Sequence, residues 1–550
     1  MKTKTVVAIM VTMLLVGMTF YAIPVKAVNY LKIGVIGPVG WIQGQGMFEG
    51  ATLAANWING PGGGIVIGGT RYDVSLHFGD EHAADMRPDL GALEMERLIT
   101  VEGVDLAMGG FRTECTIPIR DKAMDYQKIF YICGAATNEL IDCGATAPSC
   151  PYGCVRHNYA RYKYTFRNTP VNNTMLVRNI VGFLRYYALP SRLAPLYGSP
   201  VRTAVIAENL TWADTLFNMF VFGGYLGPQA NIVYSARTPW DAMSFAVQLD
   251  AMHAREVRLI VHLFSGPSSI AFIRQWAANP IKAIPVGIDE IGQLTEFWSL
   301  TGGGRDGFPN PSDVYATGGC QYETLLATSG TRSPISTVSQ PYTTVQVWDQ
   351  FFATFGHAPI YTSWGVYDTI IAIHDMLEAQ TAIKPPFDLA DANALVPIIE
   401  ATNRNGVLGK FKYTQYHDPY SIEFLSTWPL GYVRPLVVQW QAGRLEVVWP
   451  SKTSWSKIWA LPDETGKMYP YPSDVNQDGQ IGNEDRLIMR AAIGTRPKNP
   501  NVPADPMWQF VADVVPDRVI DLFDALAVRA RYGWSVELPL PYCNEAGRLH

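Results

Sequence analysis

The chain has 550 residues, of which 48% are hydrophobic and 17% are charged, and its formal net charge is −6. This apolar share excludes a largely disordered protein, and the acidic balance gives no indication of a nucleic-acid partner. Seven cysteines are too few for a small disulfide-dependent scaffold, and the length predicts several domains.

The first 27 residues have the pattern of a secretory signal. Lys2 and Lys4 precede an apolar stretch at 6–23, and the small residue Ala27 ends the segment. We expect cleavage after Ala27, so that residues 1–27 are a signal peptide and the remainder is exported to an extracellular, cell-surface or periplasm-like space. An uncleaved membrane anchor is the alternative, because the stretch approaches the length of a membrane span.

From residue 30 onward, strand-like and helix-like segments alternate. The first series predicts strands at 30–39, 72–78, 105–109 and 129–133, with helices at 47–57 and 88–100. Strands that alternate with helices form crossover units, in which a parallel sheet is covered on both faces.

A second series of the same kind begins near residue 173. It predicts helices at 174–187, 211–222, 244–253 and 268–278, and strands at 202–207, 230–235, 257–264 and 283–287. A long helix at 364–380 and strands at 407–412, 436–441 and 445–448 follow. Two α/β lobes place a cleft between them, and ligands of open α/β sheets bind beyond the carboxyl ends of the strands.

Three of the cysteines, Cys143, Cys150 and Cys154, crowd into a Gly/Pro-rich segment at 142–155. In an exported protein this crowding favours a local disulfide. A metal site is the weaker reading, because the spacing matches no common zinc pattern. The sequence leaves the pairing among the seven cysteines open.

Residues 30 to about 450 resemble the type I periplasmic solute-binding proteins of ABC importers, of the leucine/isoleucine/valine-binding kind. The resemblance rests on the order of several short motifs along the chain. They are the opening strand and Gly-Pro turn at 30–38, the first helix and Gly-rich loop at 50–69, Phe78-Gly-Asp80, the Ala-Thr loop at 134–140, the late helix with Tyr367-Asp368, and the Gly-x-Phe strand at 407–411.

This resemblance implies an α/β fold of two lobes, each an open parallel sheet, joined by three hinge crossovers that close on a small ligand. It also implies which residues bind the ligand. By matching positions these are Trp41, Arg112, Thr113, Ala135, Ala136 and Thr137 in the first lobe and Trp212, Phe264, Asp289 and Glu290 in the second. In amino-acid binders of the family, the first lobe holds the ligand carboxylate and an acid of the second lobe holds its ammonium group. Asp289 matches that acid, and the adjacent Glu290 is the alternative.

The loop at 111–114 departs from the family pattern, because Arg112 stands where small Ser or Thr residues are usual. An arginine there could clamp a carboxylate or a second anionic group through two parallel hydrogen bonds. It could equally pair with Glu114 on the surface. A branched-chain or related amino acid is therefore only the default ligand.

Beyond residue 468 the sequence changes character and contains an EF-hand-like loop at 474–485. Asp474, Asn476 and Asp478 take loop positions one, three and five, Gly479 is the turn glycine, and Asp485 closes the loop. Oxygen atoms at alternate positions are the ligands of Ca²⁺, with Gln480 giving its carbonyl at position seven.

A weaker copy of the loop starts at residue 513. Its expected ligands are Asp513, Asp517, Val519, Asp521 and Asp524. Val515 replaces the position-three ligand and Arg518 replaces the turn glycine, so a helix-capping loop with solvated acids is the alternative. We expect one or two Ca²⁺ ions in this region.

Two loop–helix copies with Asp at position twelve resemble a type I dockerin module over 470–535. The resemblance implies a small all-α calcium-loop module and a cohesin domain as a partner. Packing of the module against its own lobes is the alternative.

These expectations divide the chain into six parts. They are the signal peptide at 1–27, a first lobe at 29–168 and 295–400, a second lobe at 169–294 and 401–450, a linker at 451–469, the dockerin-like module at 470–535 and a tail at 536–550.

The expected function is that of an extracellular receptor, not an enzyme, that delivers a small polar ligand to an ABC importer permease. A cell-surface sensory or interaction protein with the same fold is the alternative. An exported hydrolase is disfavoured, because no paired carboxylates, nucleophile elbow, zinc-protease motif or phosphate loop appears. The expected partners include no nucleic acid.

Overall fold

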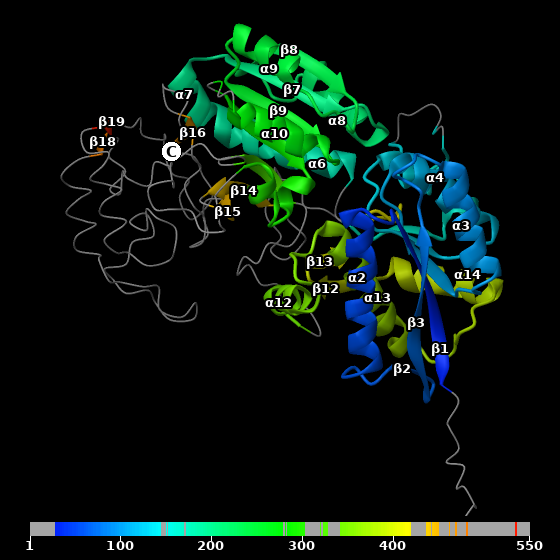
Figure 1. Ribbon diagram of the computed structural model, residues 1–550. Helices are drawn as coiled ribbons and strands as arrows, with labels where there is room; N and C mark the ends of the chain where they lie inside the picture. Colours follow the sequence, from blue (N-terminus) through cyan, green and yellow to red (C-terminus); the bar gives the residue numbers. More distant parts are fainter. Residues whose placement is uncertain are drawn as a thin grey trace, which may run out of the picture.

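The computed structural model describes residues 28–144, 150, 152–169, 172–278, 281, 283–302, 320, 323–327, 342–419, 436–441 and 443–449. It also describes four two-residue strands, β16 (Leu461–Pro462), β17 (Met468–Tyr469), β18 (Gln480–Ile481) and β19 (Trp534–Ser535). Two α/β lobes make up most of this part of the chain, and they lie next to each other (Figure 1).

The first lobe is built on a six-stranded sheet in the order β2-β3-β1-β4-β5-β6. All neighbouring strands are parallel except β2 and β3. The strands are β1 (Asn29–Gly37), β2 (Ile65–Ile67), β3 (Thr70–Asp80), β4 (Leu106–Gly109), β5 (Phe130–Ile132) and β6 (Thr165–Arg167). The helices are α2 (Ile42–Asn59), α3 (Pro88–Thr100), α4 (Thr113–Asp125), η1 (Asn138–Leu140) and α5 (Tyr159–Tyr162).

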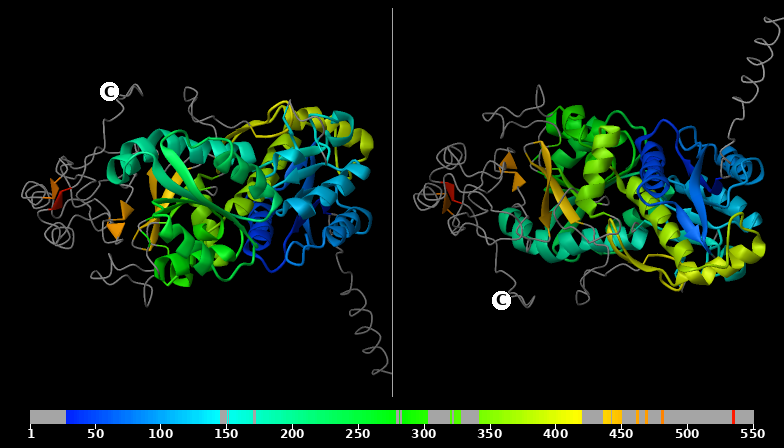
Figure 2. Two further views of the ribbon diagram at one scale, coloured as in Figure 1. Left: turned by 90° about the horizontal axis from the view of Figure 1, so that it is seen from above. Right: turned by 90° about the horizontal axis from the view of Figure 1, so that it is seen from below.

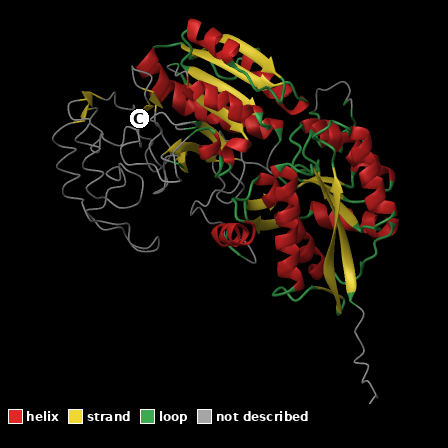
Figure 3. Ribbon diagram, in the orientation of Figure 1, coloured by secondary structure: helices red, strands yellow, loops and turns green. Residues whose placement is uncertain are grey.

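The second lobe is built on a seven-stranded sheet in the order β15-β14-β11-β10-β9-β7-β8. The strands are β7 (Val201–Glu208), β8 (Ala230–Thr238), β9 (Leu259–Phe264), β10 (Ile284–Asp289), β11 (Thr324–Ala327), β14 (Leu436–Gln441) and β15 (Arg444–Trp449). The helices are α6 (Asn173–Phe183), η2 (Leu184–Leu193), α7 (Ala194–Tyr197), α8 (Thr211–Val221), α9 (Ala246–Ala254), α10 (Ser268–Ala278), η3 (Ile291–Gln293) and α11 (Phe297–Leu300). Figure 3 shows helices beside the strands in both lobes.

The chain returns to the first lobe for α12 (Thr344–Phe355), α13 (Tyr361–Ala379), α14 (Leu389–Glu400), β12 (Asn403–Gly406) and β13 (Gly409–Lys412). Helix α13 packs closely on α2. Gly50 makes this approach possible, because a Cβ atom at that position would collide with the carbonyl of Ser363. Three crossings between the lobes follow from this path, after β6, after β11 and after residue 419. The fold class expected from the alternating pattern, two open parallel sheets with crossovers, is therefore confirmed.

Two of the expected lobe boundaries differ from the structure. Strand β11 pairs with β10 in the second lobe, although we placed 295–400 in the first. The segment from 403 to 419 belongs with the first lobe, because Arg404 contacts Asp368 and the Tyr413 hydroxyl donates to Asn168. The strands expected from the sequence do not include β11, and hydrophobic patterns do not state which of two sheets a segment joins.

The helix expected at 174–187 begins as α6 and continues as η2, a π-helix. Pro190 lies inside η2. Because proline has no backbone N–H, a regular α-helical ladder cannot continue through it.

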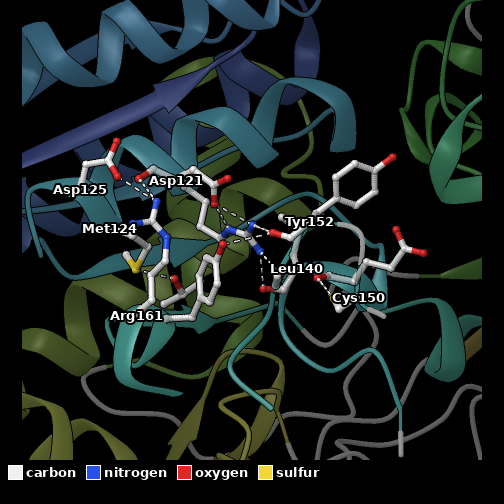
Figure 4. A network of polar contacts seen from close by, with 12 residues as sticks. Asp121, Met124, Asp125, Leu140, Cys150, Tyr152 and Arg161 are labelled. Atoms are coloured by element: carbon white, nitrogen blue, oxygen red, sulfur yellow. Dashed lines mark hydrogen bonds and ion pairs between the residues drawn. The ribbon is translucent and has the colours of Figure 1, made fainter. Parts of the chain in front are cut away.

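The expected local disulfide is confirmed, and it joins Cys143 to Cys150. The neighbouring Arg120 is fully buried and donates hydrogen bonds to the carbonyls of Leu140, Tyr152 and Gly153. Figure 4 shows this network, with Leu140 and Tyr152 close together and Arg161 directed at Asp125. The buried arginine therefore holds the disulfide segment against the first lobe.

A buried ion pair joins two of the three crossings. Nε of Arg167, at the end of β6, lies 2.6 Å from Oδ1 of Asp418, and both side chains are at most 8% exposed. The Arg167 backbone N–H also donates to the carbonyl of His417. The segments that leave the first lobe after 167 and after 418 are thereby held side by side.

We predict that Asp418→Ala lowers the free energy of unfolding by roughly 3–5 kcal/mol, because it removes the carboxylate that balances the charge of a buried guanidinium. The matched control is Asp73→Ala, which breaks the more exposed Arg71–Asp73 pair and should cost less than about 1 kcal/mol. Urea denaturation of both variants measures the difference. Equal losses in the two variants would contradict a structural role for Asp418.

Candidate functional site

The carboxyl ends of parallel strands from both sheets lie at the boundary between the two lobes. Direct contacts cross it in the described part of the chain. Nε2 of Gln43 donates to the carbonyl of Ser265 at 3.1 Å, and the carboxylate of Glu114 accepts from the Thr211 N–H at 2.9 Å. Figure 2 shows the two lobes from above and below, lying against each other on this boundary.

Arg112 lies at the same boundary and is 3% exposed. Its guanidinium carbon lies 5.0 Å from the ring centroid of Trp41, in the first lobe, and 4.8 Å from that of Trp240, in the second. Nε, Nη1 and Nη2 have no hydrogen-bond partner among the described residues. The cation is therefore stabilised by two indole faces, while its hydrogen-bond donors remain unused.

Glu81 fixes the backbone that carries Arg112. Its carboxylate accepts from the N–H groups of Phe111, at 2.7 Å, and Arg112, at 2.5 Å. Burial raises the pKa of Glu81 to about 8, and the two N–H donors oppose that shift. This loop leads into α4, whose first residue, Thr113, has a buried hydroxyl without a partner among the described residues.

Two acids of the second lobe lie near Arg112. Glu208 ends β7 and is well satisfied, since Ser265 donates from both its N–H and its hydroxyl, each at 2.7 Å, and Gly266 N–H donates at 2.8 Å. Glu290 follows β10, and its Oε2 is buried without a partner among the described residues. Burial and the charge of Glu208 raise the pKa of Glu290 well above its usual range, and the Tyr361 hydroxyl opposes the shift.

Four of the residues singled out from the sequence lie at this boundary. Trp41, Arg112 and Thr113 come from the first lobe, and Glu290 comes from the second. Trp212 lies at the start of α8, where its indole N–H is 3.4 Å from Glu208. Together these residues place a cation without hydrogen-bond partners among the described residues, an acid and aromatic side chains at the boundary.

The loop at 135–137, which the resemblance places at the ligand, lies in the first lobe, and its carbonyl groups accept hydrogen bonds from the protein itself. The guanidinium of Arg167 donates to the carbonyls of Ala135 and Thr137, and the Asn173 N–H donates to the carbonyl of Ala136. These three carbonyls are used for internal bonding within the fold.

Phe264 and Asp289 lie inside the second lobe. Phe264 is fully buried against Phe245 and Phe272. Asp289 is also fully buried, and its carboxylate lies beside His262 and Glu323. Of the two acids considered from the sequence, Glu290 is therefore the one whose surroundings include Arg112 and Tyr361.

Sequence reasoning missed Trp240, Glu208 and Tyr361 at the boundary. Glu208 could have been found, because it ends a buried strand in the same way as Asp289 does. Trp240 lies just beyond β8 in a segment with no pattern of its own. Only the closure of the lobes brings its indole to 5.3 Å from that of Trp41, measured between ring centroids.

The residues expected to bind calcium fall largely outside the described part of the chain. They are Asp474, Asn476, Asp478, Asp485, Asp513, Asp517, Val519, Asp521 and Asp524. Gln480 lies in β18, which pairs with β19. The expected signal peptide at 1–27 also lies outside it. In the residues that are described, no helix is both long and apolar enough to span a membrane.

No family model matches the chain, and no curated protein is similar to it in sequence. Solved structures are similar in fold. A putative branched-chain amino acid ABC transporter protein from Silicibacter pomeroyi aligns with a TM-score of 0.59 and 16% identity, over 78% of this chain and 99% of that chain. A leucine-binding protein from Thermotoga maritima aligns with a TM-score of 0.53 and 16% identity, over 76% and 97%.

A solute-binding protein of an ABC transporter from R. palustris, solved in complex with benzoate, aligns with a TM-score of 0.54 and 15% identity, over 76% of this chain and 96% of that chain. At identities of 15–16%, this structural similarity shows the fold alone. The described lobes have the two-lobed α/β fold of the type I periplasmic binding proteins that serve ABC transporters.

Proposed function

We propose that this protein is an exported solute-binding receptor that captures a small carboxylate, by default an amino acid, between its lobes and delivers it to an ABC importer. The observation that carries the proposal is the guanidinium of Arg112, buried at the lobe boundary with all three nitrogen atoms unpaired among the described residues. A buried charge without hydrogen bonds is costly, and a bound anion would remove that cost.

A carboxylate suits Arg112 because the planar guanidinium can donate two parallel hydrogen bonds to its oxygen atoms. Trp41 and Trp240 flank the cation and restrict its orientation. They would also exclude water from the pair, which strengthens the electrostatic attraction. The hydroxyl of Thr113 is a further unused donor at the same place.

Glu290 favours a zwitterion as the ligand. Its unpaired Oε2 lies at the boundary in the opposite lobe, where an ammonium group would lower its raised pKa and restore the charged carboxylate. Proteins of this fold have been solved with isoleucine and with benzoate. A carboxylate is common to both ligands, and the ammonium group distinguishes them.

We further propose that the ligand is held without chemical change and that residues 470–535 form a calcium-binding, dockerin-like module for attachment to a cohesin domain. The spacing of Asp474, Asn476, Asp478, Gly479 and Asp485 supports the calcium proposal. Export through the signal at 1–27 would place such a module outside the cell.

Arg112→Gln should weaken binding of a carboxylate ligand by roughly 2–5 kcal/mol, the usual effect of removing one partner of a buried charge pair. Thermal-shift screening of amino acids and benzoates, each paired with its neutral amide, identifies the ligand, and calorimetry measures the loss. Arg97→Gln is the control, because Arg97 pairs with Glu94 and Glu102 on the first lobe. Equal binding of acids and amides, or unchanged affinity in the Arg112 variant, would contradict the proposal.

Glu290→Gln should weaken an amino acid more than its analogue without the amino group, because only the amino acid presents an ammonium ion to the carboxylate. The exposed Glu296 offers a control, Glu296→Gln. Affinities for both ligands are measured by calorimetry. If the Glu290 variant leaves the preference between the two ligands unchanged, Glu290 does not bind an ammonium group and the ligand is not held as a zwitterion.

Chelation of calcium should expose the C-terminal region to protease near Pro470 and leave the two lobes as a fragment of about 440 residues, because small metal-dependent modules fold only with their ion. Asp474→Ala combined with Asp478→Ala should have the same effect without chelator. Limited proteolysis followed by mass spectrometry measures both. A tail that resists protease equally with and without calcium would show that packing holds it.

A further inference from the structure

A second cluster of metal-ligating side chains lies inside the second lobe. It consists of His262 on β9, Asp289 at the end of β10 and Glu323 immediately before β11. One ligand atom from each residue lies within 4.8 Å of the other two. Nε2 of His262 and Oε1 of Glu323 are 3.0 Å apart, and all three residues are fully buried.

Strand pairing brings these residues together from distant parts of the sequence. His262 is the register partner of Gly287, two residues before Asp289, and Val286 pairs with Thr324, the neighbour of Glu323. The Gly292 N–H donates to Oδ1 of Asp289 at 2.9 Å and so fixes the orientation of that carboxylate. A hydrogen bond of this kind is typical of the outer shell that orients a metal ligand.

The polar atoms of the cluster face one another inside the second lobe. Nε2 of His262 faces Oε1 of Glu323 at 3.0 Å, and Oδ2 of Asp289 and Oε2 of Glu323 accept no hydrogen bond from an N–H or O–H group of the described residues. Buried polar atoms in folded proteins nearly always have partners, and two buried carboxylates close together repel each other unless a cation or protons neutralise them. The geometry therefore indicates a bound species that satisfies these atoms together.

We propose that His262, Asp289 and Glu323 bind a divalent transition-metal cation of the zinc class inside the second lobe. One imidazole nitrogen and two carboxylate oxygens are donors that Zn²⁺ accepts, and the two negative charges cancel those of the ion. Tetrahedral binding at about 2.0–2.2 Å sets donor atoms about 3.3–3.6 Å apart, so small side-chain rotations would complete the site.

The ion would cross-link the central strands of the second lobe, from β9 through β10 to β11. Asp289 is directly followed by Glu290, so the ion would also fix the backbone that carries the boundary acid. The proposal concerns the second lobe alone and does not depend on the ligand or on transport.

Other metal-binding groups of the chain can be distinguished from this cluster. Two of the three sulfur atoms at 143–154 are joined in a disulfide and are not available as ligands. The expected loops beyond 474 offer oxygen ligands only, which select Ca²⁺ rather than zinc. The loss of zinc in variants of His262 and Glu323 is therefore the specific measure of this cluster.

The test is elemental analysis of the full chain after loading with Zn²⁺ and dialysis into metal-free buffer. The wild type should retain about one zinc per chain, and His262→Gln and Glu323→Gln should retain roughly a tenth of that or less. His374→Gln is the matched control, because His374 lies between Asp375 and Glu378 on the first lobe. This variant should keep its zinc.

A measurement on the wild type keeps the test decisive if the variants fail to fold. Co²⁺ added to metal-free wild-type protein should give the visible absorption of a low-coordinate site, and one equivalent of Zn²⁺ should abolish it. Wild-type protein without zinc and without this spectrum would overturn the proposal. Full zinc retention in folded His262→Gln and Glu323→Gln proteins would also overturn it, since the ion would then lie elsewhere.

Discussion

The burial of the Arg112 guanidinium is the constraint on which the lobe boundary depends. A charge that has left water must be compensated by its surroundings, and here each lobe supplies an indole face, from Trp41 and Trp240. Cation–π contacts stabilise the positive charge but use none of its N–H donors. The two lobes can close in this arrangement because Gln43 and Glu114 also form hydrogen bonds across the boundary. The unpaired donors then define the chemistry of whatever lies between the lobes.

The same boundary requires a chain path that returns to each lobe. The first lobe is completed by α13, whose Tyr361 hydroxyl donates to the carbonyl of Gly134, and the second by β14 and β15. The Arg167–Asp418 pair holds two of the crossings together, and Arg167 also donates to the loop at 135–137. A change in lobe orientation would therefore act on segments that are bonded to one another, as expected for hinge closure around a ligand.

The sequence predicted the lobes well because the strands are short, buried and separated by clear helices. Helices α3 and α10 have the expected limits, and β14 does as well. Disulfide formation near 143–154 was predictable from crowding alone. Strand β11 was not among the expected strands, and its pairing with β10 joins residues that are distant in the sequence.

The candidate site was predictable only in part, for the same reason. Arg112 and Glu290 stand in loops that follow strands, which is where a parallel sheet carries its ligands. Trp240 and Glu323 have no local signal, since each acquires its neighbours through tertiary packing. Asp289 matched a family position in the sequence, but the fold places its carboxylate beside His262 and Glu323 within the second lobe.

The most direct measurement is a crystal structure of the protein with the tightest-binding carboxylate from the screen. The account predicts that both carboxylate oxygens lie within hydrogen-bond distance, about 2.7–2.9 Å, of the Arg112 guanidinium, between the indoles of Trp41 and Trp240. A ligand bound between the lobes without contact to Arg112, or bound outside the boundary, would contradict it.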